Sequence, residues 1–150
     1  MAHWSIPFDK LAKKVGADIE IVVKAAALKV FSEVVIRSPV DTGRFRANWN
    51  IAYNVMNEST TDELMPDFQP KIDSFRRELL AMPIGGVYWL TNSLPYAMTL
   101  EYGLYPNPPK RYTGKTKNGY SKQAPHGMVR VAARNFAEDV DRAVNGRRKR

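Results

Sequence analysis

The apolar positions of the first 37 residues follow a helical period. They recur every three or four residues, at Phe8, Leu11, Val15, Ile19, Val22, Ala26, Val30 and Val34. This stripe predicts one long amphipathic helix from about Phe8 to Arg37. Pro39 ends it, because the residue before a proline disfavours helical dihedral angles. The charged residues Lys10, Lys14, Lys24 and Glu33 fall mostly outside the stripe.

The period changes to two between Phe45 and Val55. Apolar and polar residues alternate there over eleven positions, which predicts a strand with one buried face. The stretch from Asn57 to Pro70 is rich in acidic, hydroxyl and proline residues, and these indicate a surface loop. A second strand, Val87 to Thr91, follows the Gly85-Gly86 pair and is rich in aromatic and branched side chains.

Three further helices are expected. One covers about Lys71 to Met82, with Ile72, Phe75, Leu79 and Met82 on a single face. A short one covers Pro95 to Tyr102 and stops at Gly103. The last covers about Gly127 to Val144, and its expected core face consists of Val129, Ala132, Phe136, Val140 and Ala143.

These elements predict an α+β fold. We expect a small antiparallel sheet packed by the long N-terminal helix and the C-terminal helix, with a long basic loop. Two strands are too few to be stable alone, so further strands should come from residues 104–125 or from the region of Pro83. With 150 residues the chain is long enough for one domain, residues 1–146, followed by a basic tail, residues 147–150.

The charge is unevenly distributed along the chain. The formal net charge is +8, yet residues 105–150 contain twelve Lys and Arg residues against three acids. A nearly neutral body with a basic final third favours an acidic partner, either a protein surface or nucleic acid. The tail 147–150 could equally be a solvated segment that keeps the protein in solution.

Residues 104–125 are the candidate docking segment. They contain four prolines, three tyrosines and five basic residues but no acid, and a stretch of this length without a clear element is typical of functional or disordered loops. Asn118-Gly119 could close a small hairpin there. The candidate docking residues are Tyr105, Lys110, Arg111, Tyr112, Lys115, Lys117 and Lys122. We rank a protein interface first, a mobile loop second and nucleic-acid binding third.

Catalytic, metal and cofactor sites find little support in the sequence. The chain has no cysteine, and its two histidines, His3 and His126, lie at opposite ends without nearby ligands. Asp41-Thr42-Gly43 matches the aspartic-protease triplet but lacks the apolar strand before it, so we interpret it as a turn in which Gly43 takes a positive φ. We expect no cofactor, no transmembrane helix and no secretion signal.

Two motifs together carry a resemblance. The first is Pro39-Val40-Asp41-Thr42-Gly43-Arg44-Phe45-Arg46, and the second, about fifty residues later, is Tyr96-Ala97-Met98-Thr99-Leu100-Glu101-Tyr102-Gly103. With the first and last helices, this order resembles the small head-to-tail joining proteins of long-tailed bacteriophages, also called neck, tail-completion or minor tail component proteins. Those proteins carry P-V-D-T-G-x-L-R and Y-A-x-x-x-E-x-G segments. The chain departs from them at Phe45, where leucine is commoner, and in its long basic loop.

The resemblance implies a non-enzymatic virion protein. It would form a ring, by preference a hexamer, where the DNA-filled head meets the tail, after a cytoplasmic assembly stage. Its neighbours would be the connector or adaptor ring and the tail terminator or tail tube proteins, with DNA close by. It also implies that Pro39, Val40, Asp41, Thr42, Gly43 and Arg44 build a turn. In the second motif, Tyr96, Ala97, Glu101 and Gly103 recur, Tyr96 and Leu100 should pack inward, and Glu101 is expected to pair with a cation such as Arg44.

Two other classes remain as alternatives. A small basic nucleic-acid-binding protein would bind DNA with an affinity that falls steeply as salt rises. An aspartic protease would lose its activity when Asp41 is replaced by alanine.

Overall fold

A computed structural model describes residues 19–148 of the chain. Its helices and strands, in order, are α2 (Ile19–Arg37), α3 (Arg44–Ala47), β1 (Asn50–Tyr53), α4 (Gln69–Ala81), β2 (Tyr88–Thr91), α5 (Ala97–Tyr102), β3 (Thr116–Lys117), β4 (Tyr120–Ser121) and α6 (Val129–Arg148). This is the predicted α+β class. The part of the long first helix before Ile19 lies outside the described residues.

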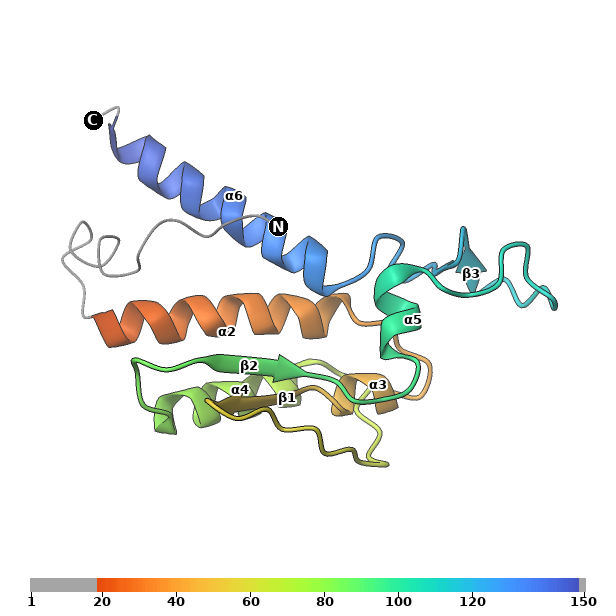
Figure 1. The fold of residues 1–150 in the computed structure, drawn as a ribbon, viewed down its shortest axis with the longest axis horizontal. Coiled ribbons are helices and arrows are strands. Elements are labelled where there is room, and N and C mark those ends of the chain that lie inside the picture. Colours follow the sequence, from red (N-terminus) through yellow and green to blue (C-terminus); the bar gives the residue numbers. More distant parts are fainter. Residues whose placement is uncertain (1–18, 149–150) are drawn as a thin grey trace.

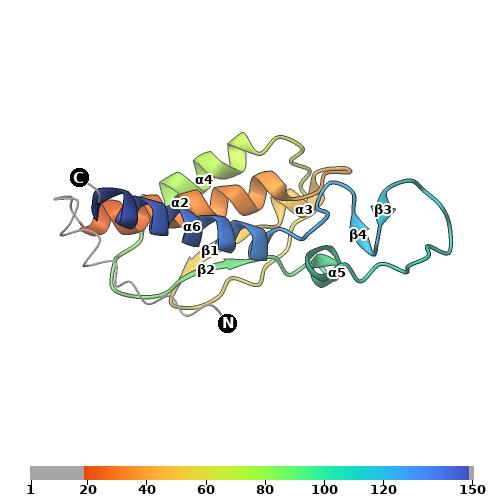
Figure 2. The same ribbon diagram turned by 90° about the horizontal axis from the view of Figure 1, so that it is seen from above.

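The body of the molecule is layered around α2 (Figure 1). The β1–β2 sheet and α4 lie on one side of α2, and α6 crosses it on the other side. The two strands are antiparallel, with Asn50 opposite Thr91 and Tyr53 opposite Tyr88. The prediction placed α6 on the sheet; the view from above shows it passing over α2 (Figure 2).

The core fills the space between these layers. It contains the fully buried Val34 and Val35 of α2, Phe75 and Leu79 of α4, and Met128 just before α6. Phe31 meets Phe75 edge to face, with ring centroids 6.4 Å apart. Edge-to-face aromatic pairs add to the stability that comes from burial alone. The predicted apolar face of α4 is therefore confirmed.

The inward face of α2 is rotated from the predicted stripe. The residues packed inward are Ala27, Leu28, Phe31, Val34 and Val35. Lys24, which lies off the predicted stripe, is only 8% exposed; its ammonium donates to Leu80 O at 3.1 Å and pairs with Glu20 at 2.7 Å. α2 is apolar on several sides, so periodicity alone could not fix which side meets α4.

The predicted strand from Phe45 to Val55 is wrong in its first half. Residues 44–47 form the helical turn α3, and β1 occupies only Asn50–Tyr53. Every residue from Phe45 to Trp49 is buried, so the polar positions Arg46 and Asn48 do not face solvent as the alternation predicted. Both bury their polar groups because each is hydrogen-bonded to backbone.

The other predictions hold except for the extent of the sheet and the exposure of Val129. α5 ends at Gly103, which takes the left-handed conformation with φ 66°, as expected for a glycine after a helix. Asn118-Gly119 does close a hairpin, β3–β4, and both residues have positive φ. This hairpin makes its own two-stranded sheet and does not extend β1–β2, which corrects the expected larger sheet. On α6, Ala132 and Val140 are buried as predicted and Phe136 is partly buried, whereas Val129 is exposed. The side chain of Ala143, also predicted to face the core, lies outside the described residues.

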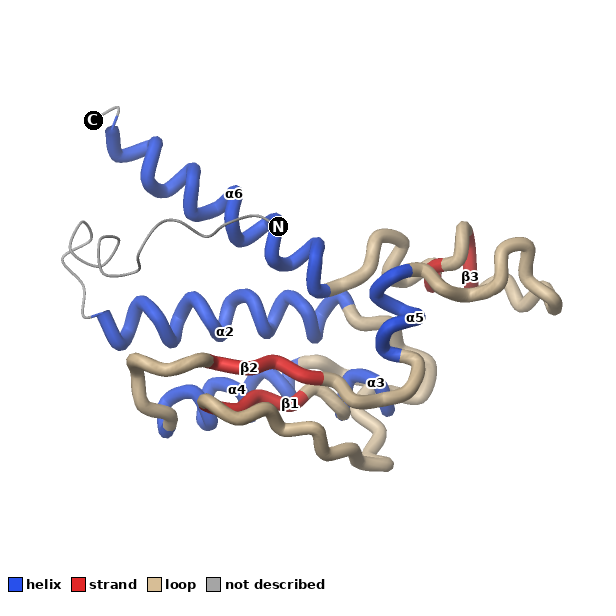
Figure 3. The backbone as a smooth tube through the Cα atoms, viewed as in Figure 1, coloured by secondary structure: helices blue, strands red, loops and turns tan. Residues whose placement is uncertain are grey.

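Residues 104–125, here called the basic arm, project from one end of the body. Figure 3 shows that the body is built mainly of helices, while the arm is mostly loop with the short β3–β4 hairpin. Its base is fixed beside α5, where Tyr105 N donates to Gly119 O at 3.0 Å. The arm therefore has a fixed base and an extended outer loop.

Candidate docking site

The turn of the first motif is built around Gly43. This residue has φ 91°, a conformation that glycine adopts without strain. A Cβ built here would lie 2.4 Å from the backbone of Met65 and Pro66. Met65 N donates to Gly43 O at 3.1 Å, and Arg44 N donates to Thr42 Oγ1 at 3.4 Å. Glycine is required both for the turn and for the close approach of residues 65–66.

Arg46, the last residue of the first motif, ties the turn to its surroundings. Its guanidinium donates to the carbonyl oxygens of Val35 at 3.1 Å, and of Ile36 and Ser38 at 3.2 Å each. It also donates to Pro66 O. Burial lowers the pKa of Arg46, and Asp67 opposes that shift. The alternation in the sequence placed Arg46 on a solvent face and so did not reveal its structural role, although the first motif ends at this arginine.

Glu101 of the second motif joins α5 to the start of α6. Its carboxylate accepts hydrogen bonds from the backbone N–H groups of Met128 at 2.8 Å, Val129 at 2.9 Å and Arg130 at 3.0 Å. The Arg130 side chain completes the arrangement with a 3.1 Å ion pair to Glu101. A carboxylate at a helix N-terminus satisfies free N–H groups and interacts favourably with the helix dipole.

Arg44 is therefore not the partner of Glu101, which corrects the expected pairing. Arg44 pairs with Asp62 at 3.0 Å. The two motifs instead meet through packing: Phe45 lies 5.7 Å, centroid to centroid, from the ring of Tyr96. Leu100 is buried as expected, and Tyr96 is partly buried against the core. Burial raises the pKa of Tyr96, while nearby Arg44 opposes the shift.

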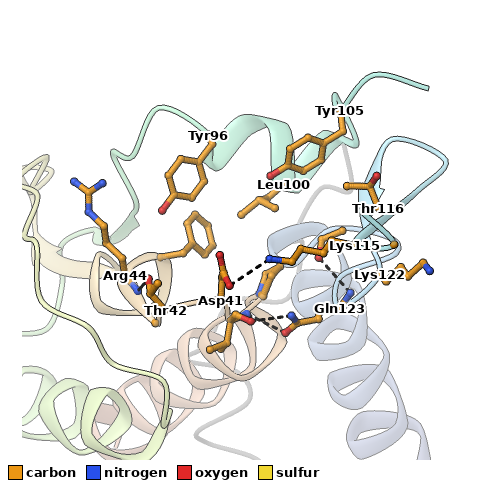
Figure 4. A pocket seen from close by; sticks show the side chains of 16 residues that line it. Asp41, Thr42, Arg44, Tyr96, Leu100, Tyr105, Lys115, Thr116, Lys122 and Gln123 are labelled. Carbon is orange, nitrogen blue, oxygen red and sulfur yellow. Dashed lines mark hydrogen bonds and ion pairs between the residues drawn. The ribbon is translucent and has the colours of Figure 1, made fainter. Parts of the chain in front are cut away.

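A pocket of about 680 Å³ lies between the first motif, α5 and the arm (Figure 4). We call it the motif pocket. Its lining residues are Pro39, Val40, Asp41, Thr42, Gly43, Arg44, Phe45, Tyr96, Leu100, Tyr105, Gly114, Lys115, Thr116, Ser121, Lys122 and Gln123. The wall is largely apolar on the α5 side, with cations on the turn and the arm. All six residues of the first-motif turn thus contribute to one concave surface.

Two contacts hold the arm across the pocket. Gln123 makes a reciprocal pair with Val40, donating to Val40 O and accepting from Val40 N, both at 2.9 Å. Lys115 approaches Asp41 at 3.5 Å (Figure 4), with side chains 71% and 83% exposed. An ion pair so exposed contributes little to stability. Asp41 is thus a solvated carboxylate beside a lysine, which is not the shared-proton carboxylate pair of an aspartic protease.

The predicted docking residues fall into two groups. Tyr105, Lys115 and Lys122 line the motif pocket. Lys110, Arg111, Tyr112 and Lys117 lie outside it on the arm and are exposed, with Tyr112 82% exposed. Among the second-motif residues, Tyr96 lines the pocket, Ala97 packs on the core, Glu101 caps α6, and Gly103 ends α5.

Within residues 19–148, no cluster of three His, Asp or Glu side chains is placed to hold a metal ion. Over the same residues, no helix is long and apolar enough to cross a membrane. The concave, part-apolar and part-cationic surface is suited to binding an acidic polypeptide segment.

Comparison with known proteins agrees with the motifs. Residues 7–71 match a family model described as "Bacteriophage HK97-gp10, putative tail-component". No curated protein and no solved structure matches the chain. The matched segment contains α2, the first-motif turn, Arg46 and β1. The predicted resemblance is thereby confirmed: residues 7–71 are similar to the HK97-gp10-like tail components of bacteriophages, and this similarity supports a structural role.

Proposed function

We propose that the protein is a neck component that forms a ring and joins the DNA-filled head to the tail. The observation that carries this proposal is the basic arm, which extends from the body beside the motif pocket. A similarity to phage tail components supports a structural role and leaves open where in the particle the protein acts. The arm supplies the surface through which it would act.

The arm is suited to contacts made on docking. It carries five cations and no acid, and Lys110, Arg111, Lys117 and Lys122 have no carboxylate within ion-pair distance among residues 19–148. Uncompensated cations on an extended segment attract an acidic surface and increase the rate of association with it. A connector or adaptor ring on the head side, or a terminator ring on the tail side, would supply that surface.

Contacts with α5 and α6 hold the base of the arm to the body, so a partner that binds the arm is connected to the whole subunit. Arg130 donates to Glu101 O at 2.6 Å and stacks on Tyr102 at 4.7 Å, while Glu101 caps α6. α5, the hairpin and α6 are thereby tied together at the point where the arm leaves the body. A ring of such subunits, for which we favour six, would present its arms at one end of the particle.

The first test is an infection that lacks this protein, with the particles imaged by negative-stain electron microscopy. Full heads beside complete but unattached tails are expected. Joined, intact particles would overturn the proposed function. In that case a nucleic-acid role would be the next candidate, and it would require DNA binding that weakens steeply with salt.

A second test reverses the arm charges. Replacing Lys110, Arg111, Lys115 and Lys117 with Glu should leave the fold intact, as measured by circular dichroism, and give unjoined heads and tails. A control variant reverses two exposed cations of the body, Arg77→Glu and Arg134→Glu, and changes the net charge by half as much. Normal joining by the arm variant would remove the arm from the mechanism.

A further inference from the structure

Residues 57–68, here called the acidic loop, carry the charge opposite to that of the basic arm. The loop carries Glu58, Asp62, Glu63 and Asp67 and no basic residue. All four carboxylates belong to exposed residues. Leu64 lies among them and is 61% exposed. The loop therefore displays an apolar side chain within a group of acids, the combination that the motif pocket would accept.

The loop is held in one shape by polar residues of the body, of which Arg46 and Asn48 are buried. Asn48 accepts from Thr61 N at 2.8 Å and donates to Thr61 O at 2.9 Å. Asn50 donates to Ser59 O at 2.8 Å, and Arg46 donates to Pro66 O. These bonds fix the backbone of Ser59, Thr61 and Pro66, while the acidic side chains of the loop are exposed. A preformed loop loses little conformational entropy on binding.

We propose that the acidic loop of one copy occupies the motif pocket of the next copy in the ring. This inference rests on the proposed function and specifies the contact between subunits. Leu64 would lie against the apolar wall formed by Phe45, Tyr96 and Leu100. Glu63 and Glu58 would pair with Lys122 and Lys115 of the neighbour. Loop and pocket adjoin each other within one copy, through Arg44–Asp62 and Gly43–Met65. A loop-to-pocket contact that is repeated in one direction from copy to copy closes into a ring.

Within one copy, few ion pairs engage the acids of the acidic loop and the lysines of the motif pocket. Arg44, at the pocket edge, already has Asp62 of its own loop at 3.0 Å. Glu58 and Glu63 have no cation within ion-pair distance among the described residues, and Lys122 has no carboxylate. Lys115 has only the exposed 3.5 Å pair with Asp41. Lys71 attracts Glu63 without forming an ion pair, so among the described residues the charge of Glu63 is partly compensated, while those of Glu58 and Lys122 are left for a second copy to pair.

Disulfide trapping in assembled particles tests the contact directly, because the chain contains no cysteine. Single variants Glu63→Cys and Lys122→Cys are expressed together in the infection lacking the native protein, and isolated particles are oxidised. A covalent dimer containing one of each variant is expected. The control pairs Lys122→Cys with Glu138→Cys, an exposed acid on α6. A dimer yield no higher than that of the control would overturn the proposal.

Charge exchange provides an independent measurement. The loop variant Glu58→Lys/Glu63→Lys and the pocket variant Lys115→Glu/Lys122→Glu should each lower the yield of joined particles by at least about tenfold, since like charges then face each other. One chain carrying all four substitutions should regain joining. Normal joining by either two-residue variant, or no recovery in the four-residue variant, would overturn the proposal. If loss of the whole protein also left particles joined, the proposed function itself would fail, and the two failures remain distinguishable.

Discussion

Removal of the Glu101 carboxylate should destabilise the whole fold, although Glu101 lies outside the hydrophobic core cluster. In Glu101→Ala, the N–H groups of Met128, Val129 and Arg130 lose their acceptor, and Met128 is 1% exposed. The exposed N–H groups can turn to water, whereas that of Met128 has little access to it. The carboxylate side chain is itself only 10% exposed.

The magnitude follows from counting these bonds. A net contribution of about 1 kcal/mol for each of three backbone bonds gives a loss of about 3 kcal/mol in the free energy of unfolding. For a chain of this size, that loss lowers Tm by roughly 6–12 °C. Glu101→Gln keeps one acceptor oxygen but directs an NH₂ group toward the remaining donors, so a loss of about 1–2 kcal/mol is expected.

Urea unfolding followed by circular dichroism measures both variants against the parent protein. Glu138→Ala, on the exposed side of α6, is the matched control and should change the free energy of unfolding by less than about 0.5 kcal/mol. If Glu101→Ala also stays within about 0.5 kcal/mol of the parent, Glu101 does not hold the start of α6 as argued.

Three further predictions concern the first motif and Tyr96. Gly43→Ala should cost at least about 2 kcal/mol, because its Cβ would meet the backbone of Met65, whereas Gly114→Ala, also at positive φ but in open space, should cost only about 1 kcal/mol. Equal losses in urea unfolding would contradict the close approach. Arg46→Lys should cost about 2–3 kcal/mol, since one ammonium cannot reach four carbonyl oxygens in fork geometry, and an unchanged unfolding midpoint would refute this. Burial raises the pKa of Tyr96 above its ordinary value of 10.0, so the unfolded chain ionises first and stability falls as pH rises above about 10. Tyr96→Phe should therefore lose less stability between pH 9 and pH 11 than the parent does, as judged by urea midpoints, and parallel losses would refute this contribution.

The segment from Phe45 to Val55 shows where pattern and packing diverge. Its alternation of apolar and polar residues is genuine in the sequence, yet only Asn50–Tyr53 is a strand. Arg46 and Asn48 have the polarity of a solvent face but find backbone partners inside the fold. A periodicity argument assumes that polar side chains seek water, and it fails where buried carbonyl groups supply the hydrogen bonds instead.

The sequence by itself determined the features that depend on neighbouring residues. The end of α2 before Pro39, the glycine turn at Gly43, the apolar face of α4 and the Asn118-Gly119 hairpin all follow from local conformational preference and period. The basic arm and the acidic loop are likewise visible as composition. These are properties of short segments, so a single chain is enough to find them.

Only the tertiary structure decided which distant groups meet. Charge alone suggested Arg44 for Glu101, but the fold brings the start of α6 to that carboxylate and Asp62 to Arg44. It also gathers both motifs and the arm around one pocket. Such pairings depend on where backbone N–H and C=O groups are left without helical or strand partners. That is fixed by how the elements pack, and no local pattern encodes it.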